Sequence, residues 1–445
     1  MKKFLSFLVA AAMITSMAGC GSSTTSESES ESTTSAPVSD STPATDATSG
    51  EDTSSSTTTS AVVEEEQIPE VKYELGGELT PTMIANSVLN KGDQARLAKV
   101  IKKLQAGESV VVAYLGGSIT QGSSAGNELC YARLTTNWLE EQFPDAKIKY
   151  VNAGIGATGS YIGIHRADRD VLAYDPDLVF IDFSVNDTSD RITTNKSTYE
   201  GLIRKLWSHD TAPAVICLAM TQENGTSVQD AHYEIAAKYD IPMISYRNAI
   251  LDVIDKGYII WDDISDDNIH PNIQGHAVLT QMITNYLQTV IDNIDTIDAT
   301  EPELAEADAM GAKYQNAEIV VPGDERCTDM GLFKEHNMTF GNFGIPWVAK
   351  VPGGTEVTGG LEFTVNAKNV GILYGKMISN GGTLDVYVDD ELMMSINCTF
   401  PGGWGSYVEF AEIASFDEAG EHTVKLVPQQ SDDAALYYVS ALTIS

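Results

Sequence analysis

Ser118 stands where a nucleophilic serine could work. It follows the apolar run VVVAYL and two glycines, Gly116 and Gly117. A serine on a tight turn between a buried strand and a helix exposes its hydroxyl, and the backbone N–H groups of the turn point the same way. This arrangement suits attack on an acyl carbon, although turns also use Gly-Gly-Ser for purely conformational reasons.

Two further stretches could stabilise the oxyanion that such an attack creates. NAGIGATGS follows the apolar run IKYV, and its Gly154 and Gly156 let the backbone turn tightly enough to offer an N–H to a ligand. SVND follows DLVFIDF and puts the side-chain amide of Asn186 at a strand end. Together with the N–H of Ser118, these groups would supply three donors to an oxyanion.

The stretch DDNIHPN could supply the base. Asp267 and His270 lie three residues apart, and in a turn this spacing lets the carboxylate accept a hydrogen bond from the imidazole that it orients. Plainer interpretations exist: Asn186 and Asp187 could cap a turn, and His270 could be a surface residue at a helix start. Those interpretations would have to coincide at one sheet edge in the order that acyl transfer requires. The sequence therefore predicts a Ser-His-Asp site.

These stretches interrupt an alternation of strands and helices between about residues 93 and 293. Runs typical of buried strands are VVVAYL, IKYVNAG, DLVFIDF, AVICLAM and PMISY. Helical patterns fall at about residues 131–142, 161–174, 197–208, 228–237, 247–255 and 273–291. Five strands alternating with helices predict a doubly wound, flavodoxin-like α/β domain with a five-stranded parallel sheet. In such sheets ligands bind at the carboxyl ends of the strands.

In this order, the four stretches resemble the sequence blocks of the SGNH, or GDSL-like, hydrolase superfamily, over about residues 110–276. The roles that the resemblance implies are Ser118 as nucleophile and first oxyanion donor, Gly156 or Ala157 as second donor, Asn186 as third donor, His270 as base and Asp267 as its partner. The family's Gly-Asp-Ser is Gly116-Gly117-Ser118 here. This departure leaves the nucleophile in place but puts the oxyanion geometry in question.

The C-terminal part follows a different pattern. From about residue 320, short alternating strands separated by Gly, Pro, Asn and Asp predict an antiparallel β-sandwich. Its aromatic residues include Trp347, Trp404, Tyr407, Tyr437 and Tyr438. Aromatic faces can stack on sugar rings, but aromatic residues in sandwiches more often belong to the core. Packing against the catalytic domain is therefore the preferred interpretation, with sugar binding as the alternative.

The N-terminal part is expected to target and tether the chain. MKKFLSFLVAAAMITSMAGC has the three-part pattern of a secretory signal, and its end resembles a bacterial lipobox, which implies lipid attachment at Cys20. Residues 21–66 contain ten acidic residues and no Lys or Arg, a composition typical of disorder. The expected parts are a signal peptide at 1–19, a tether at 20–68, a hydrolase domain at 69–298 and a β-sandwich at 310–445.

Charge and composition limit the classes of ligand that the chain is expected to bind. The formal net charge of −36 argues against nucleic acid as a ligand. No cofactor or metal is expected, because the acidic loop at residues 262–267 lacks calcium-loop spacing. Arg166 and Asp170, four residues apart, are expected to form a surface pair. Cys217 lies in an apolar run and is expected to be a buried free thiol.

The expected function is a serine esterase that removes small acyl groups, acetyl above all, from carbohydrate. The expected location is the extracellular face of a bacterial membrane, reached only through the lipid anchor, or the medium if the lipobox is not used. Two alternatives stay open. A polysaccharide O-acetyltransferase would use the same residues, and a surface glycan-binding lipoprotein would carry a vestigial catalytic domain.

Overall fold

The computed structural model describes residues 70–307 and 312–445. The expected signal peptide, Cys20 and the tether lie outside these residues. Within the described ranges, no helix combines the length and the apolar character needed to cross a membrane.

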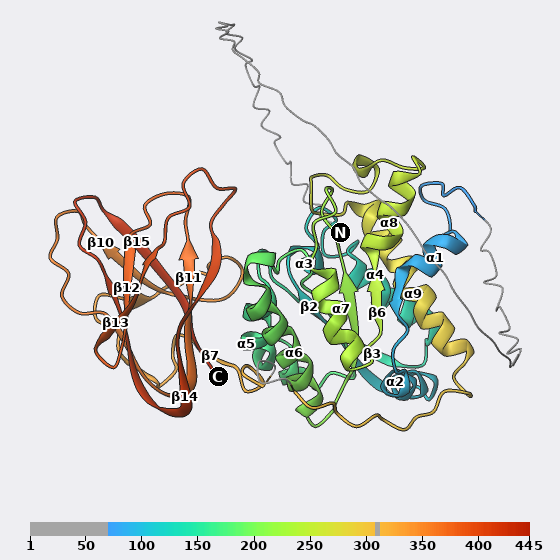
Figure 1. Ribbon diagram of the computed structural model, residues 1–445, viewed down its shortest axis with the longest axis horizontal. Coiled ribbons are helices and arrows are strands. Elements are labelled where there is room, and N and C mark those ends of the chain that lie inside the picture. Colours follow the sequence, from blue (N-terminus) through green and yellow to red (C-terminus); the bar gives the residue numbers. More distant parts are fainter. Residues whose placement is uncertain (1–69, 308–311) are drawn as a thin grey trace, which may run out of the picture. The chain divides into compact units, whose positions relative to one another are not determined.

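Strands and helices alternate through the first part of the described chain (Figure 1). Its strands are β1 (Val88–Asn90), β2 (Ser109–Gly116), β3 (Lys147–Gly154), β4 (Leu178–Asp182), β5 (Ala214–Ala219) and β6 (Met243–Ser245). Its α-helices are α1 (Pro81–Ser87), α2 (Ala95–Gln105), α3 (Ser118–Gln121), α4 (Tyr131–Gln142), α5 (Ser160–Asp170), α6 (Ile192–Ser208), α7 (Gln229–Lys238), α8 (Tyr246–Asp255) and α9 (Ile273–Asp292). Short 3-10 turns are η1 (Leu172–Tyr174), η2 (Ser189–Arg191) and η3 (Trp261–Asp263).

The strands form one sheet in the order β1-β6-β5-β4-β2-β3. From β3 to β6 every pairing is parallel, which confirms the doubly wound, flavodoxin-like sheet of five parallel strands. The short strand β1 adds an antiparallel edge beside β6 and was not expected. The chain passes from β2 outward to β3 and then back to β4, on the other side of β2. The direction of winding therefore changes beside β2, where such folds bind their ligands.

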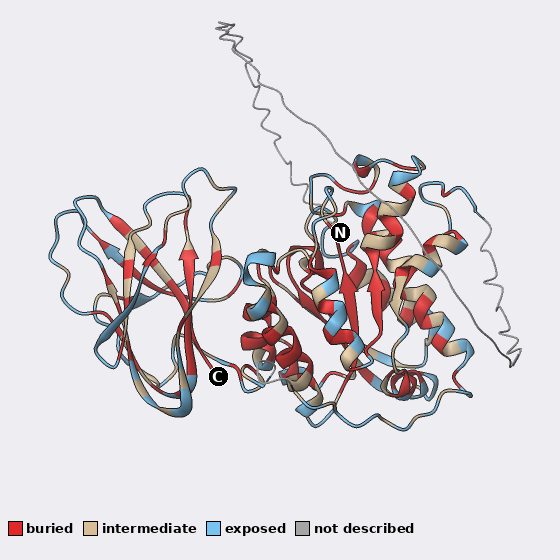
Figure 2. Ribbon diagram, viewed as in Figure 1, coloured by how far each residue is buried: buried red, intermediate tan, exposed pale blue. Residues whose placement is uncertain are grey.

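Apolar residues pack on both faces of this sheet, and Figure 2 shows its central strands coloured as buried. Along β2 they alternate as a strand requires, because Val112 and Tyr114 join one core while Ala113 and Leu115 join the other. Helices α2, α4, α8 and α9 cover the first face, and α5, α6 and α7 cover the second. Cys217 is a buried free thiol, as expected. The rigid core leaves the strand ends and the loops after them to form the site.

The C-terminal part is an all-antiparallel β domain, which confirms the predicted β-sandwich. Its strands are β7 (Glu318–Val320), β8 (Cys327–Asp329), β9 (Lys334–Glu335), β10 (Trp347–Val351), β11 (Leu361–Lys376), β12 (Thr383–Val388), β13 (Glu391–Asn397), β14 (Tyr407–Pro428) and β15 (Ala435–Ile444). Two pairs of predicted strands merge into β11 and β14, because these strands pair along their whole length. The turn signals in between correspond to β-bulges near Ala367 and Val370.

The described residues belong to one compact unit, in which the β domain contacts the α/β domain. The ring of Tyr161 on α5 stacks on Phe410 of β14 at 4.1 Å between centroids, and its hydroxyl lies 2.9 Å from the hydroxyl of Thr443. Arg191 of η2 pairs with Glu409 at 3.0 Å. Because η2 follows β4 by a short turn, the β domain contacts the α/β domain close to the sheet edge that carries the site.

Candidate active site

The turn between β2 and α3 carries Ser118. A Cβ on Gly116 would overlap Thr120, and a Cβ on Gly117 would come closer than 3.0 Å to Oδ1 of Asn186, which real Cβ atoms essentially never do. The N–H of Gly117 donates to the carbonyl of Asp182 at the end of β4. Gly116 is therefore fixed by close packing that includes the Asp182 carbonyl, whereas a side chain at position 117 would require the Asn186 side chain to move. Ser118 begins the first turn of α3 with 8% of its surface exposed.

The structure brings the predicted serine, histidine and aspartate into one hydrogen-bonded line. The Ser118 hydroxyl lies 2.8 Å from Nε2 of His270. Nδ1 of His270 lies 2.7 Å from Oδ2 of Asp267. A carboxylate at Nδ1 fixes the tautomer that donates there, which leaves Nε2 free to accept the serine proton. The three side chains can therefore perform nucleophilic acyl transfer.

Asp267 is held in its ionised form by hydrogen bonds. Burial opposes ionisation, but the His270 ring and the backbone N–H groups of His270 and Ile269 outweigh it and lower the pKa of the carboxyl. Both N–H groups donate to Oδ1 at 2.7 Å. Oδ2 is thus left for the imidazole, and a charged carboxylate there stabilises the imidazolium that forms when the serine loses its proton.

The loop that carries Asp267 and His270 is fixed by residues that the sequence did not single out. The Ser265 hydroxyl lies 2.8 Å from the carbonyl of Asp267 and 2.6 Å from that of His270. The indole N–H of Trp261 donates to the same Asp267 carbonyl. A serine or tryptophan near a predicted site carries no sequence signal for backbone bracing, because the partners are carbonyl groups common to all residues.

Asn186 lies against the nucleophile turn. Its side chain is the first group that a Cβ on Gly117 would meet. Glycine in place of the family's aspartate therefore leaves this space to the Asn186 side chain. The backbone N–H groups of Asn186 and Asp187 both donate to the carbonyl of Phe183, at 3.0 and 2.9 Å. This tight turn after β4 places the Asn186 side chain against Gly117, the residue before Ser118.

The loop after β3 had two candidate donors, and the structure distinguishes them. The N–H of Gly156 donates to Oε1 of Gln121 at 2.6 Å. Ala157 has a φ of 59°, the left-handed conformation that favours glycine. Because the Gly156 N–H is already engaged, the geometry favours Ala157 as the donor from this loop.

Arg166 corrects a sequence expectation. It pairs with Asp170 at 3.0 Å, as the spacing predicts, but Arg166 is fully buried rather than on the surface. Its guanidinium also donates to the carbonyls of Ala153 at 2.7 Å and Gly116 at 3.0 Å. It therefore ties the end of β2 to the end of β3. The apolar Ile162, one turn earlier on α5, was the available signal that this helix face is buried.

Asp182 is a buried carboxyl beneath the nucleophile turn. Burial raises its pKa to about 7, although the Thr120 hydroxyl, 3.1 Å from Oδ2, opposes the shift. The Thr120 hydroxyl also lies 2.8 Å from that of Tyr131. Among the described residues, Oδ1 has no hydrogen-bond partner. Asp182 therefore contacts the nucleophile turn through Thr120, and burial disfavours its ionised form.

A polar cavity of about 540 Å³ opens beside α3. Its lining residues are Gln121, Asn127, Glu128, Arg133, Tyr150, Asn152 and Gly154. Gln121 links it to the loop of Gly156. Across residues 70–307 and 312–445, no group of three or more His, Cys, Asp or Glu side chains is placed to hold a metal ion.

Comparisons with known proteins found one matching family model and similar solved structures. Residues 114–278 match the model of the GDSL-like Lipase/Acylhydrolase family. A solved structure of a two-domain esterase (CEX) active on acetylated mannans is 31% identical, with a TM-score of 0.73 over 81% of this chain and 98% of that one. The same kind of esterase co-crystallised with mannopentaose is 30% identical, with a TM-score of 0.73 over 84% and 98%. No curated protein matches the chain.

Proposed function

Because the chain belongs to the GDSL-like lipase/acylhydrolase family and is an SGNH-type hydrolase, we propose that it is a serine esterase that removes acetyl groups from carbohydrate. The observation that carries this proposal is the hydrogen-bonded line from Ser118 through His270 to Asp267, beside the amide of Asn186. The similar two-domain esterase is described as active on acetylated mannans. Acetylated mannan is therefore the first substrate to test.

In the proposed mechanism, Nε2 of His270 takes the proton of the Ser118 hydroxyl as its oxygen attacks the ester carbonyl. Asp267 holds Nδ1–H and stabilises the imidazolium. The N–H groups of Ser118 and Ala157 and the amide of Asn186 donate to the oxyanion. The tetrahedral intermediate collapses, and His270 protonates the departing sugar oxygen. Water activated by His270 then hydrolyses the acetyl-serine and releases acetate.

The close packing at Gly117 supports an active rather than a vestigial site. A side chain there would displace Asn186, so glycine keeps the amide next to the nucleophile. A decayed site has no reason to keep this contact together with the line from Ser118 to Asp267. The glycine that departs from the family triplet therefore fits an intact oxyanion site.

Exposed aromatic residues support a carbohydrate substrate. Trp347 and Tyr437 pack in the core of the β domain itself, whereas the sequence favoured packing against the catalytic domain. Trp404 differs, because 72% of its surface is exposed and its ring stacks on Tyr407 at 5.0 Å between centroids. A flat exposed indole supported from behind fits the apolar face of a sugar ring. We infer that Trp404 contacts the glycan.

The first test replaces Ser118. Ser118→Ala should lower hydrolysis of 4-nitrophenyl acetate and acetate release from acetylated mannan by about 10⁴-fold or more. Ser124→Ala, an exposed serine beyond α3, serves as the matched control and should keep full activity. Retained activity in Ser118→Ala would overturn the assignment. Product analysis with an acetyl donor and unacetylated mannan separates hydrolysis from O-acetyl transfer, since the two differ in whether water reaches the acyl-enzyme.

The location is a separate proposal that rests on the sequence. We propose attachment to the outer face of a bacterial membrane by lipid on Cys20, with no nucleic-acid partner. Labelling of the full chain with radioactive palmitate should be lost in Cys20→Ala. An unlabelled wild-type chain in the medium would contradict the anchor but not the esterase activity.

A further inference from the structure

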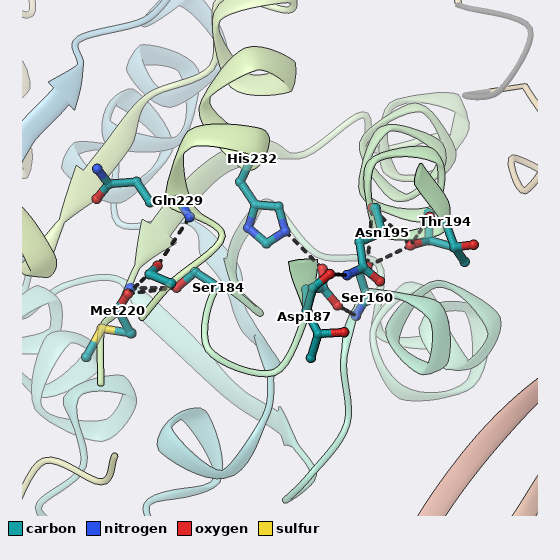
Figure 3. Close-up of polar contacts among 11 residues, drawn as sticks. Ser160, Ser184, Asp187, Thr194, Asn195, Met220, Gln229 and His232 are labelled. Atoms are coloured by element: carbon teal, nitrogen blue, oxygen red, sulfur yellow. Dashed lines mark hydrogen bonds and ion pairs between the residues drawn. The ribbon is translucent and has the colours of Figure 1, made fainter. Parts of the chain in front are cut away.

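The turn that carries Asn186 is held by a buried carboxylate that the proposed chemistry does not use. Asp187, the next residue, is 6% exposed. Its Oδ1 accepts from the backbone N–H of Ser160 at 2.8 Å, and its Oδ2 lies 2.9 Å from Nε2 of His232 (Figure 3). One side chain therefore joins the turn after β4 to both α5 and α7.

His232 has few other roles open to it. Its imidazole is fully buried and stacks on the ring of Tyr199 at 3.8 Å between centroids, with 6° between the planes. Among the described residues, its Nδ1 has no hydrogen-bond partner. In the part of the chain that the structure describes, the hydrogen bond to Asp187 is the polar contact of the His232 ring. The stack on Tyr199 of α6 fixes the plane of the ring and so the direction in which Nε2 points.

The other end of the carboxylate reaches the second oxyanion loop. Ser160 is the first residue of α5 and follows the loop of Ala157 by a few residues. A carboxylate at a helix N-terminus is favourable because the free N–H groups there carry partial positive charge. A Cβ on Gly159 would come 2.5 Å from Oδ1 of Asp187, so the glycine allows this approach. Asp187 is therefore a direct link between the Asn186 turn and the Ala157 loop.

We propose that Asp187 and His232 form a positioning pair for the oxyanion site. The pair fixes the spacing between the Asn186 amide and the Ala157 N–H, and His232 acts through Asp187. This inference rests on the proposed esterase function. Oxyanion donors stabilise charge that develops only in the transition state, so a misplaced donor lowers kcat and leaves KM nearly unchanged.

The test compares variants of His232 and of a control residue. His232→Phe keeps the ring stack on Tyr199 but removes the donor to Asp187, and His232→Gln restores an N–H near the same position. Tyr239→Phe is the control, because it removes a buried hydrogen bond to Glu200 at the other end of α7. We measure kcat, KM and Tm for each variant in the full chain with 4-nitrophenyl acetate.

We expect His232→Phe to lose roughly tenfold in kcat, with KM within about twofold, and His232→Gln to recover most of the loss. Tyr239→Phe should lower Tm without changing kcat. If His232→Phe does not fold, the comparison uses His232→Asn, whose shorter amide falls short of Asp187.

Two results would overturn the proposal. An unchanged kcat in the donor-less variant would reduce His232 to a structural role while leaving the esterase assignment intact. A wild-type chain without esterase activity would remove both proposals together.

Discussion

At the scale of single residues, Asp182 makes stability depend on pH in an unusual direction. Its pKa is 3.8 in the absence of structure and about 7 in the folded chain. Between these values the folded state keeps a proton that the unfolded state has released, so stability falls as pH rises from about 4 to 7. The shift corresponds to a cost on the order of 4 kcal/mol once the carboxylate is charged above pH 7.

Replacement of this carboxyl tests the expected pH dependence of stability. Asp182→Asn keeps a polar group beside Thr120 but cannot ionise. The unfolding free energy of the variant, relative to the wild type, should therefore be higher at pH 8 than at pH 5, by about 1 to 4 kcal/mol. Urea unfolding at the two pH values measures this difference, and other titrating groups cancel in it. An equal difference at both pH values would show that the carboxyl does not titrate in this range.

Individual residues also show where sequence reasoning was sufficient. Ser118, Asp267 and His270 could be predicted because a strand end and a spacing of three residues are local features of the sequence. The structure places these three side chains within hydrogen-bond distance of one another. Arg166 was misplaced on the surface, since the i, i+4 spacing defines its partner but not the side of α5 that meets the sheet. The choice between Gly156 and Ala157 depended on the Gln121 side chain, a contact between two loops that no local pattern reports.

At the scale of elements, the turn from β2 into α3 gives a sharp prediction. Gly117→Asp would restore the family triplet but place a Cβ against Asn186. We expect kcat on 4-nitrophenyl acetate to fall by roughly 10²-fold, as for loss of one oxyanion donor. Gly126→Ala, whose Cβ would meet no atom within 4 Å but which has a positive φ, controls for backbone strain. An equal or higher kcat in Gly117→Asp would contradict the role given to Asn186.

The elements themselves were predictable to different degrees. Apolar runs alternating with helical patterns define β2 to β6, because parallel strands buried on both faces must be apolar throughout. The edge strand β1 was not predicted, because its three residues, Val88–Asn90, are too few to show the alternation of apolar and polar residues that is typical of a strand. The long strands β11 and β14 were each predicted as two shorter strands. The Asp and Gly residues that indicated turns between them lie in β-bulges instead.

At the scale of the whole molecule, the proposed contact of Trp404 with the glycan would make the β domain a second contact surface for the substrate. Trp404 and Tyr407 precede Glu409, which pairs with Arg191 just beyond the Asn186 turn. A polysaccharide can engage the exposed indole, whereas a small ester cannot gain from it. The two kinds of substrate should therefore respond differently to changes at Trp404.

Trp404→Ala should raise KM for acetylated mannan roughly fivefold, equivalent to about 1 kcal/mol of lost stacking. Its kcat and KM for 4-nitrophenyl acetate should stay unchanged. Tyr174→Ala, an exposed aromatic residue of the α/β domain, is the control and should affect neither substrate. A loss of activity on both substrates, or on neither, would separate the β domain from glycan recognition.

Covalent capture of the nucleophile measures the catalytic role of Ser118 directly. A fluorophosphonate probe reacts with a serine activated by a histidine base, and mass spectrometry of the digested protein locates the adduct. We expect a single adduct on Ser118 in the wild-type chain and at least about a 10³-fold slower reaction in His270→Ala. An unlabelled Ser118, or equal labelling in His270→Ala, would contradict that role.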